Sequence, residues 1–190
     1  MEKKEALEIV QRDGLELKNL PDQLKKDKEV VLKAVKTNGL ALQYADDSLK
    51  KDKKFILEAV KQDGRVLDFA DESLKKDKEI VLEAVKQNGY ALQYANDSLK
   101  KDKKFILEAV KTKQSNALEF ADESLKKDKK FILEAVKTNG LALAFADENL
   151  KKDKEIVLEA VKQDAYAMNL ADSRFINDKD FRDYLYELEG

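Results

Sequence analysis

Apolar residues recur with helical spacing in residues 77–101, which read DKEIVLEAVKQNGYALQYANDSLKK. Ile80 and Ala84 are four residues apart, as are Val81 and Val85, so these four residues share one helix face. After a Gly, a second apolar run (YALQYA) has spacings of three and four residues and predicts a shorter helix. Helices this short are marginal in water by themselves, so each must bury its apolar face against neighbours.

The chain repeats this stretch from end to end, and each copy opens with an Asp that we expect to cap the first helix. Successive opening residues lie 25 residues apart, except for one step of 26. A fixed period in this range is typical of stacked repeat proteins. The sequence therefore predicts an all-α fold, an α-solenoid of two-helix repeats with terminal capping repeats. The opening residues are Asp27, Asp52, Asp77, Asp102, Asp128, Asp153 and Asp178.

The unbroken period predicts a single repeat domain over residues 1–190. Residues 1–26 form a degenerate first copy and are predicted to be the N-terminal cap. Residues 27–177 hold six tandem repeats, and residues 178–190 are predicted to form a C-terminal cap helix.

Both predicted caps carry polar residues where other copies are apolar, as the ends of a stack require. In the first copy, Glu5, Glu16 and Asn19 replace apolar residues. At the other end, Phe175 takes the position of a repeated Leu. The last residues predict an amphipathic helix with Arg182 and Asp183 on the face that would otherwise be core. Its apolar residues are Phe181, Tyr184, Leu185 and Leu188.

A single Gly follows the first helix in most copies, and we expect it to end that helix in the left-handed conformation. The positions expected to have positive φ are Gly39, Gly64, Gly89 and Gly140. Two copies depart from this pattern. Residues 113–116 read KQSN, without Gly and with one extra residue, so this turn must be rebuilt. Ala165 replaces the Gly in the last copy, where a left-handed conformation costs roughly 1 kcal/mol or more.

Composition excludes several classes of function. Charged residues make up 40% of the chain, yet the net charge is only −2, so no dominant field favours nucleic acid or membrane. The absence of Cys and His removes thiolate metal ligands and the commonest general base. Acid pairs such as Asp46-Asp47 recur once per copy and are expected to cap helices. We therefore expect no catalytic residue, no metal and no cofactor.

The N-terminal residues lack the apolar core of a signal peptide, and no apolar run approaches the length of a membrane span. The expected location is cytoplasmic, although a signal read by a specialised export machine would leave no such mark.

A pair of Lys residues closes each copy, and stacking would bring these pairs into a row. Repeat proteins that read one RNA base per helical unit use similarly regular rows. Equally regular carboxylates accompany the Lys pairs, and no Arg or exposed aromatic residue is expected between them. A charge-balanced, solvated face is therefore favoured over phosphate binding. The pairs are Lys25-Lys26, Lys50-Lys51, Lys75-Lys76, Lys100-Lys101, Lys126-Lys127 and Lys151-Lys152.

The position directly after each Gly varies between copies that are otherwise nearly identical. A core position would tolerate Arg65 poorly, so these residues are expected to be at least partly exposed. They are the candidate partner-binding residues, with chance drift between copies as the alternative: Leu40, Arg65, Tyr90, Leu141 and Tyr166. The other aromatic residues have core spacing and are expected to pack inside: Tyr44, Phe55, Phe69, Tyr94, Phe105, Phe120, Phe131 and Phe145.

The repeated motif resembles a bacterial and protist repeat family catalogued as domain of unknown function 4116. The similarity rests on AVKTNGLALQYA from Ala34 and AVKQNGYALQYA from Ala84, and it covers about residues 27–176. This chain departs from the pattern at Ser115 and Ala165. The resemblance implies a helical repeat fold and brings no activity, cofactor or catalytic residue.

These observations favour a non-enzymatic helical repeat scaffold, monomeric, that binds a protein or peptide partner rather than nucleic acid or a membrane. A polyanion-binding role along the Lys pairs is the alternative, together with a ligand-free spacer or a designed scaffold.

Overall fold

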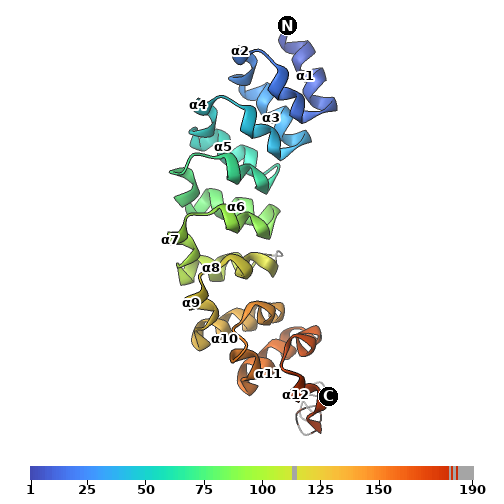
Figure 1. The fold of residues 1–190 in the computed structure, drawn as a ribbon, viewed down its shortest axis with the longest axis vertical. Coiled ribbons are helices and arrows are strands. Elements are labelled where there is room, and N and C mark those ends of the chain that lie inside the picture. Colours follow the sequence, from blue (N-terminus) through green and yellow to red (C-terminus); the bar gives the residue numbers. More distant parts are fainter. Residues whose placement is uncertain (113–114, 180, 182, 184–190) are drawn as a thin grey trace. The chain divides into compact units, whose positions relative to one another are not determined.

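The computed structural model describes residues 1–112, 115–179, 181 and 183, and none of these residues forms a β-strand. The chain divides into two compact units, unit 1 (Met1–Leu99) and unit 2 (Lys100–Gly190). Each unit is a series of tandem helical repeats, as Figure 1 shows. The predicted all-α repeat fold of the solenoid class is confirmed, whereas a single domain over residues 1–190 stays a prediction.

Each repeat begins with an α-helix that buries the predicted apolar face. In α6 (Lys78–Gln87), Ile80, Val81, Ala84 and Val85 are fully buried. The preceding Asp caps the helix as predicted, since its carboxylate satisfies backbone N–H groups that have no partner within the helix. The equivalent helices are α1 (Lys3–Arg12), α3 (Lys28–Thr37) and α5 (Lys53–Val60) in unit 1, and α8 (Lys103–Val110), α10 (Lys129–Thr138) and α11 (Lys154–Gln163) in unit 2.

The second helix of each repeat is a 3₁₀-helix. In η5 (Gly89–Tyr94), Gly89, Leu92 and the following Ala95 are buried and three residues apart. A 3₁₀-helix has three residues per turn, so this spacing places them on one face. The equivalent helices are η1 (Gly14–Asn19), η2 (Gly39–Tyr44) and η3 (Gly64–Phe69) in unit 1, and η6 (Ser115–Phe120), η7 (Gly140–Phe145) and η9 (Ala165–Leu170) in unit 2.

The link after each 3₁₀-helix contains a further helical turn, which the sequence alone did not predict. The repeated Leu of the link is buried in most repeats, with Leu49 and Leu99 each 4% exposed, and is half-buried at Leu24 and Leu150. Phe175 takes this position in the last link, as predicted, and is 5% exposed. These turns are α2 (Asp22–Lys25), α4 (Asp47–Lys50), η4 (Leu74–Lys76) and α7 (Asp97–Lys100), followed by α9 (Glu123–Lys126), η8 (Leu150–Lys152) and α12 (Ser173–Asn177).

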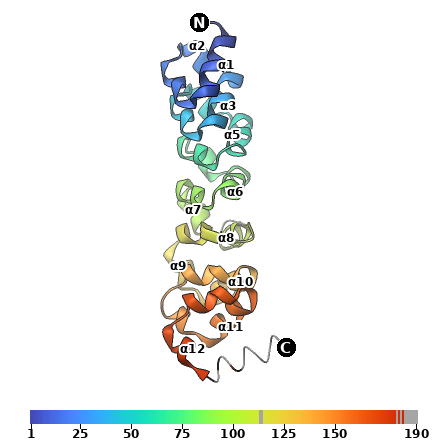
Figure 2. The same ribbon diagram turned by 90° about the vertical axis from the view of Figure 1, so that its right-hand side faces the viewer.

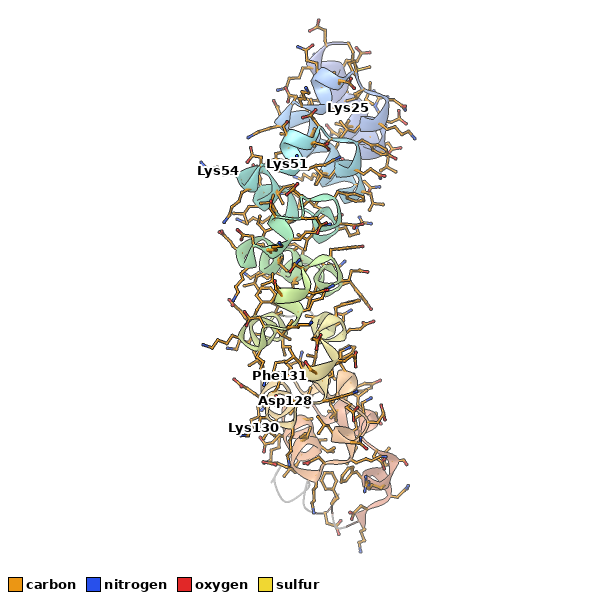
Figure 3. The ribbon with its side chains drawn as sticks, turned by 60° about the vertical axis from the view of Figure 1, so that its left-hand side comes forward. Lys25, Lys51, Lys54, Asp128, Lys130 and Phe131 are labelled. Atoms are coloured by element: carbon orange, nitrogen blue, oxygen red, sulfur yellow. The ribbon has the colours of Figure 1, made fainter. Side chains whose placement is uncertain are left out.

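Within each unit, an ion pair joins the start of one first helix to the cap of the next. Lys28 lies 2.6 Å from Asp52, and Lys129 lies 2.8 Å from Asp153. The capping Asp therefore serves both its own helix and the preceding repeat. In unit 2, Figure 3 shows Asp128 at the start of α10, where it accepts a hydrogen bond from the backbone N–H of Phe131.

Backbone hydrogen bonds join successive links in the same way. The N–H of Asp46 donates to the carbonyl of Lys25 at 3.0 Å, and the N–H of Asp147 donates to that of Lys126 at 3.0 Å. Because these bonds use backbone groups, they join successive links whatever the side chains are. The succession of α1, α3, α5 and α6 in unit 1 is visible from the side in Figure 2.

The glycines do not adopt the predicted left-handed conformation. Among the described residues, no glycine has positive φ. Asn38, which precedes Gly39, is extended at φ −154° and ψ 113° and ends α3. Its side-chain oxygen accepts from the N–H of Leu40 at 3.0 Å, so it caps the next helix. The prediction was wrong because an extended Asn or Asp, rather than a left-handed Gly, redirects the chain.

Glycine is instead required for close approach between repeats. A Cβ at Gly64 would lie 2.5 Å from the carbonyl oxygen of Ala84 in the next first helix. At Gly140 the corresponding distance, to the oxygen of Ala160, would be 2.4 Å. Real Cβ atoms essentially never approach other atoms within 3.0 Å, so any side chain would separate the two repeats.

Of the two copies without Gly, the last one fits this reason. Ala165 is exposed, and the preceding Asp164 has the usual extended backbone at φ −152° and ψ 113°. The left-handed strain predicted for Ala165 is therefore absent. Ser115 begins η6 in place of Gly. The rest of the predicted rebuilt turn, Lys113 and Gln114, lies outside the described residues.

The predicted C-terminal cap helix falls largely outside the described residues, which exclude Arg182, Tyr184, Leu185 and Leu188. Phe181 is fully buried, and its ring centroid lies 4.9 Å from that of Phe175. Asp178 accepts a hydrogen bond from the Phe181 N–H at 3.0 Å, in the manner of the other opening Asp residues.

Candidate functional site

The candidate partner-binding residues occupy the second position of the 3₁₀-helices, and we call this set the turn column. In unit 1, η2, η3 and η5 pack in succession and carry Leu40, Arg65 and Tyr90. In unit 2, η7 and η9 carry Leu141 and Tyr166. The structure thus places the members of each unit on neighbouring, equivalent helices.

The members of the turn column differ in exposure. Tyr90 is 46% exposed and Tyr166 is 61% exposed, and both are large apolar side chains at the surface. Arg65 is also exposed, whereas Leu40 and Leu141 are half-buried. The two Tyr side chains therefore offer most of the apolar surface in this set.

A constant backbone holds these variable side chains. In each case the side chain two residues earlier accepts a hydrogen bond from the backbone N–H of the column residue. The distances are 3.0 Å for Asn38–Leu40 and Asn88–Tyr90, 3.1 Å for Asn139–Leu141, and 2.9 Å for Asp63–Arg65 and Asp164–Tyr166. The residue at the column can consequently change without changing the turn that presents it.

Arg65 differs from the other members because its side chain forms an ion pair with Asp63. Its Nη2 donates to Asp63 Oδ2 at 2.7 Å, and Asp63 also accepts from the N–H of Gly39 at 3.1 Å. Burial works to raise the pKa of Asp63, but the Arg65 guanidinium and the backbone donors outweigh it and lower that pKa. Arg65 therefore neutralises a half-buried carboxylate that joins two repeats.

Two further residues have the same structural position, although sequence reasoning did not select them. Leu15 in η1 and Asn116 in η6 are both half-buried, and the N–H of Leu15 donates to Asp13 at 2.9 Å. Alignment on the Ala-Leu of the second helix would have found Asn116 despite the missing Gly.

The aromatic residues predicted to be core divide into two groups. Phe55, Phe105 and Phe131 on the first helices are buried, as predicted. The aromatic residues that close the 3₁₀-helices are only half-buried, because they lie at the edge beside the links. They are Tyr44, Phe69, Tyr94, Phe120 and Phe145.

One of these half-buried aromatic residues lies beside a Lys pair. Tyr44 lines a surface hollow of about 360 Å³ together with Lys25 and Lys26. Asp46 and Asp47 line the same hollow, as does Asp22. An aromatic ring therefore lies among the Lys residues, but in the company of carboxylates.

The Lys pairs are largely neutralised by ion pairs. The first Lys of a pair contacts the acid three residues earlier, as Lys75 does with Glu72 at 2.7 Å and Lys151 with Glu148 at 2.7 Å. The second can contact the next link, where Lys26 lies 3.6 Å from Asp46. Figure 3 shows Lys25 and Lys51 on unit 1. The charge balance inferred from the sequence is therefore present at these positions.

The described part of the chain contains neither a candidate metal site nor a candidate membrane-spanning helix. No group of three or more His, Cys, Asp or Glu side chains there could hold a metal ion. No helix there combines the length and the apolar character needed to cross a membrane.

Along the described chain, a capped 3₁₀-helix recurs and presents a variable residue from the same turn. The chain is therefore a tandem helical repeat protein. The chain belongs to the family described as domain of unknown function 4116. The family model matches residues 4–50, 27–75, 52–100, 77–126, 102–151 and 128–176, overlapping along the chain. No curated protein and no solved structure matches the chain.

Proposed function

We propose that the chain is a non-enzymatic scaffold that binds a protein or peptide partner through the turn column. The observation that carries this proposal is the contrast between a repeated backbone and variable exposed side chains. The repeated caps hold Tyr90 and Tyr166 at the surface, and partly exposed Tyr is favoured at binding hot spots.

The packing of the repeats supports the same function. Close approach at the glycines and the ion-paired caps make each repeat a fixed support for its column residue. A side chain on a rigid support loses little freedom on binding, which favours affinity. Loop-borne residues would lack this advantage.

The test is affinity capture from cells that express the protein, followed by measurement of binding to variants. Tyr90→Ala and Tyr166→Ala should each weaken binding of the captured partner, by about 2 kcal/mol where the Tyr is a hot spot. Charge reversal at Lys100 and Lys101 should have a smaller effect. A captured partner that binds both Tyr variants as tightly as the parent chain would overturn the proposal.

A further inference from the structure

A second surface carries apolar residues that nothing in the structure covers fully. In unit 1, each first helix has a half-buried Leu at one repeated position: Leu7, Leu32, Leu57 and Leu82. Helices α1 and α3 pack side by side, as Figure 1 shows, and Leu7 and Leu32 line a surface hollow of about 410 Å³. We call this the α1–α3 hollow. Its other lining residues are Gln11, Glu29, Lys33, Lys36 and Gln62.

Lys33 departs from the charge pattern of the repeats. In the other first helices this position holds Glu, and in α6 Glu83 accepts from Lys86 three residues later at 2.5 Å. In α3 the corresponding residues are Lys33 and Lys36, which have the same charge. Like charges at this spacing on a helix are unfavourable. The equivalent Glu residues are Glu8, Glu58, Glu83, Glu108, Glu134 and Glu159.

No nearby acid among the described residues forms an ion pair with these two Lys residues. Glu29 lines the hollow, but its carboxylate lies 2.7 Å from Lys3 of α1, which also lies 2.9 Å from Asp27. Within the part of the chain that the structure describes, neither Lys33 nor Lys36 forms an ion pair. The α1–α3 hollow therefore combines an apolar surface with two ammonium groups that lack carboxylate partners.

We propose that the α1–α3 hollow binds a short acidic segment of another protein, in which an apolar side chain lies beside carboxylates. The apolar side chain would contact Leu7 and Leu32, and the carboxylates would pair with Lys33 and Lys36. The side-chain amide of Gln11 can both donate to and accept from a peptide backbone. The volume of the hollow lies within the range of ordinary ligand sites, and complementary charge would accelerate association.

This surface shares no residue with the turn column, so the inference goes beyond the proposed function. The two can be separated experimentally, because Lys33 and Tyr90 lie on different helices of unit 1. A partner of the turn column should be insensitive to Lys33.

The first test is selection from a random peptide library displayed on mRNA, with the full chain as the immobilised target. Enrichment of peptides that place Asp or Glu beside Leu, Ile or Phe is the expected result. The absence of enrichment, or enriched peptides without acidic residues, would overturn the inference.

The second test is fluorescence anisotropy with the most enriched peptide, synthesised with a fluorescein label. Lys33→Glu should lower its affinity at least about tenfold, since an attractive charge becomes repulsive. This substitution introduces the residue that α6 and α11 carry at the same position, so the helix tolerates it. Leu32→Gln should also weaken binding, because it removes apolar surface from the hollow.

The matched control is Lys130→Glu, which makes the same change of charge in unit 2. Lys130 is exposed near the start of α10, where Figure 3 shows it, and the equivalent residues Glu79 and Glu155 are already Glu. Affinity should change less than about twofold, because Lys130 does not line the hollow. Equal weakening by Lys33→Glu and Lys130→Glu would refute the site. Weakening by Tyr90→Ala alone would refute it as well and assign the peptide to the turn column.

Discussion

Replacing Gly140 with Ala tests whether glycine serves close approach between repeats. The added methyl group would lie 2.4 Å from the carbonyl oxygen of Ala160 and 3.1 Å from the Cβ of Asp164. The oxygen cannot move away freely, because it accepts the final hydrogen bond of α11 from the Asp164 N–H at 3.0 Å. Either η7 moves away from α11 or this hydrogen bond weakens.

The expected magnitude follows from two opposing effects. Overpacking of a well-packed interior costs typically about 1–3 kcal/mol. The higher helix propensity of Ala returns about 0.5–1 kcal/mol. We therefore expect Gly140→Ala to lower the free energy of unfolding by up to about 2.5 kcal/mol, measured by urea unfolding with far-UV circular dichroism.

The matched control is Ala165→Gly, at the same position of the next repeat in unit 2. Ala165 is exposed, so this change removes only the propensity of Ala and should cost at most about 0.5–1 kcal/mol. If no close approach exists, Gly140→Ala should stabilise the protein by about 0.4–1 kcal/mol. A stabilised Gly140→Ala variant would therefore refute the reasoning.

Three further predictions concern the whole chain. The pKa of Asp52 is lowered by its hydrogen bond to Lys28, and that of Asp122 by the Ser124 hydroxyl. The stability from such carboxylates is complete above their unfolded pKa, about 3.9, and disappears as pH falls through the lower folded values. Urea midpoints should therefore be flat from about pH 6 to 8, where the chain has no His to titrate, and should fall as the pH drops below about 5. A loss of stability already between about pH 6 and 8 would contradict this cause. A peptide of residues 77–101 should be unfolded by NMR, because one repeat cannot bury its apolar face; a folded peptide would contradict this. Labelled single-stranded RNA should bind the chain with a dissociation constant no lower than roughly 10 μM at physiological salt, because carboxylates neutralise the Lys pairs. Tight, salt-sensitive binding would support the polyanion alternative.

Local chemistry made much of the fold predictable. The opening Asp residues cap helices because the required donors lie two and three residues away, as at Asp77. The apolar face of α6 was likewise evident from its spacing of four residues. Both features depend on residues close in sequence, so the sequence alone was sufficient.

Features that depend on the next repeat were not predictable in the same way. The Asn-Gly pair at Asn38 and Gly39 suits a left-handed helix end as well as the observed capped 3₁₀-helix, and only contact with the following repeat distinguishes them. The half-buried position of Tyr44 depends on the links beside it. The departure at Lys33 was visible in the alignment of copies, but the hollow beside it required the packing of α1 on α3.

The most direct test of partner binding through the turn column is site-specific photo-crosslinking. The amino acid p-benzoylphenylalanine would replace Tyr90, Tyr166 or, as the control, Lys130, and the chain would be irradiated in the cells that express it. We expect one protein to be crosslinked from positions 90 and 166, and to be absent or much weaker from position 130. A partner that crosslinks equally from position 130, or that binds the chain without crosslinking from either Tyr position, would contradict it.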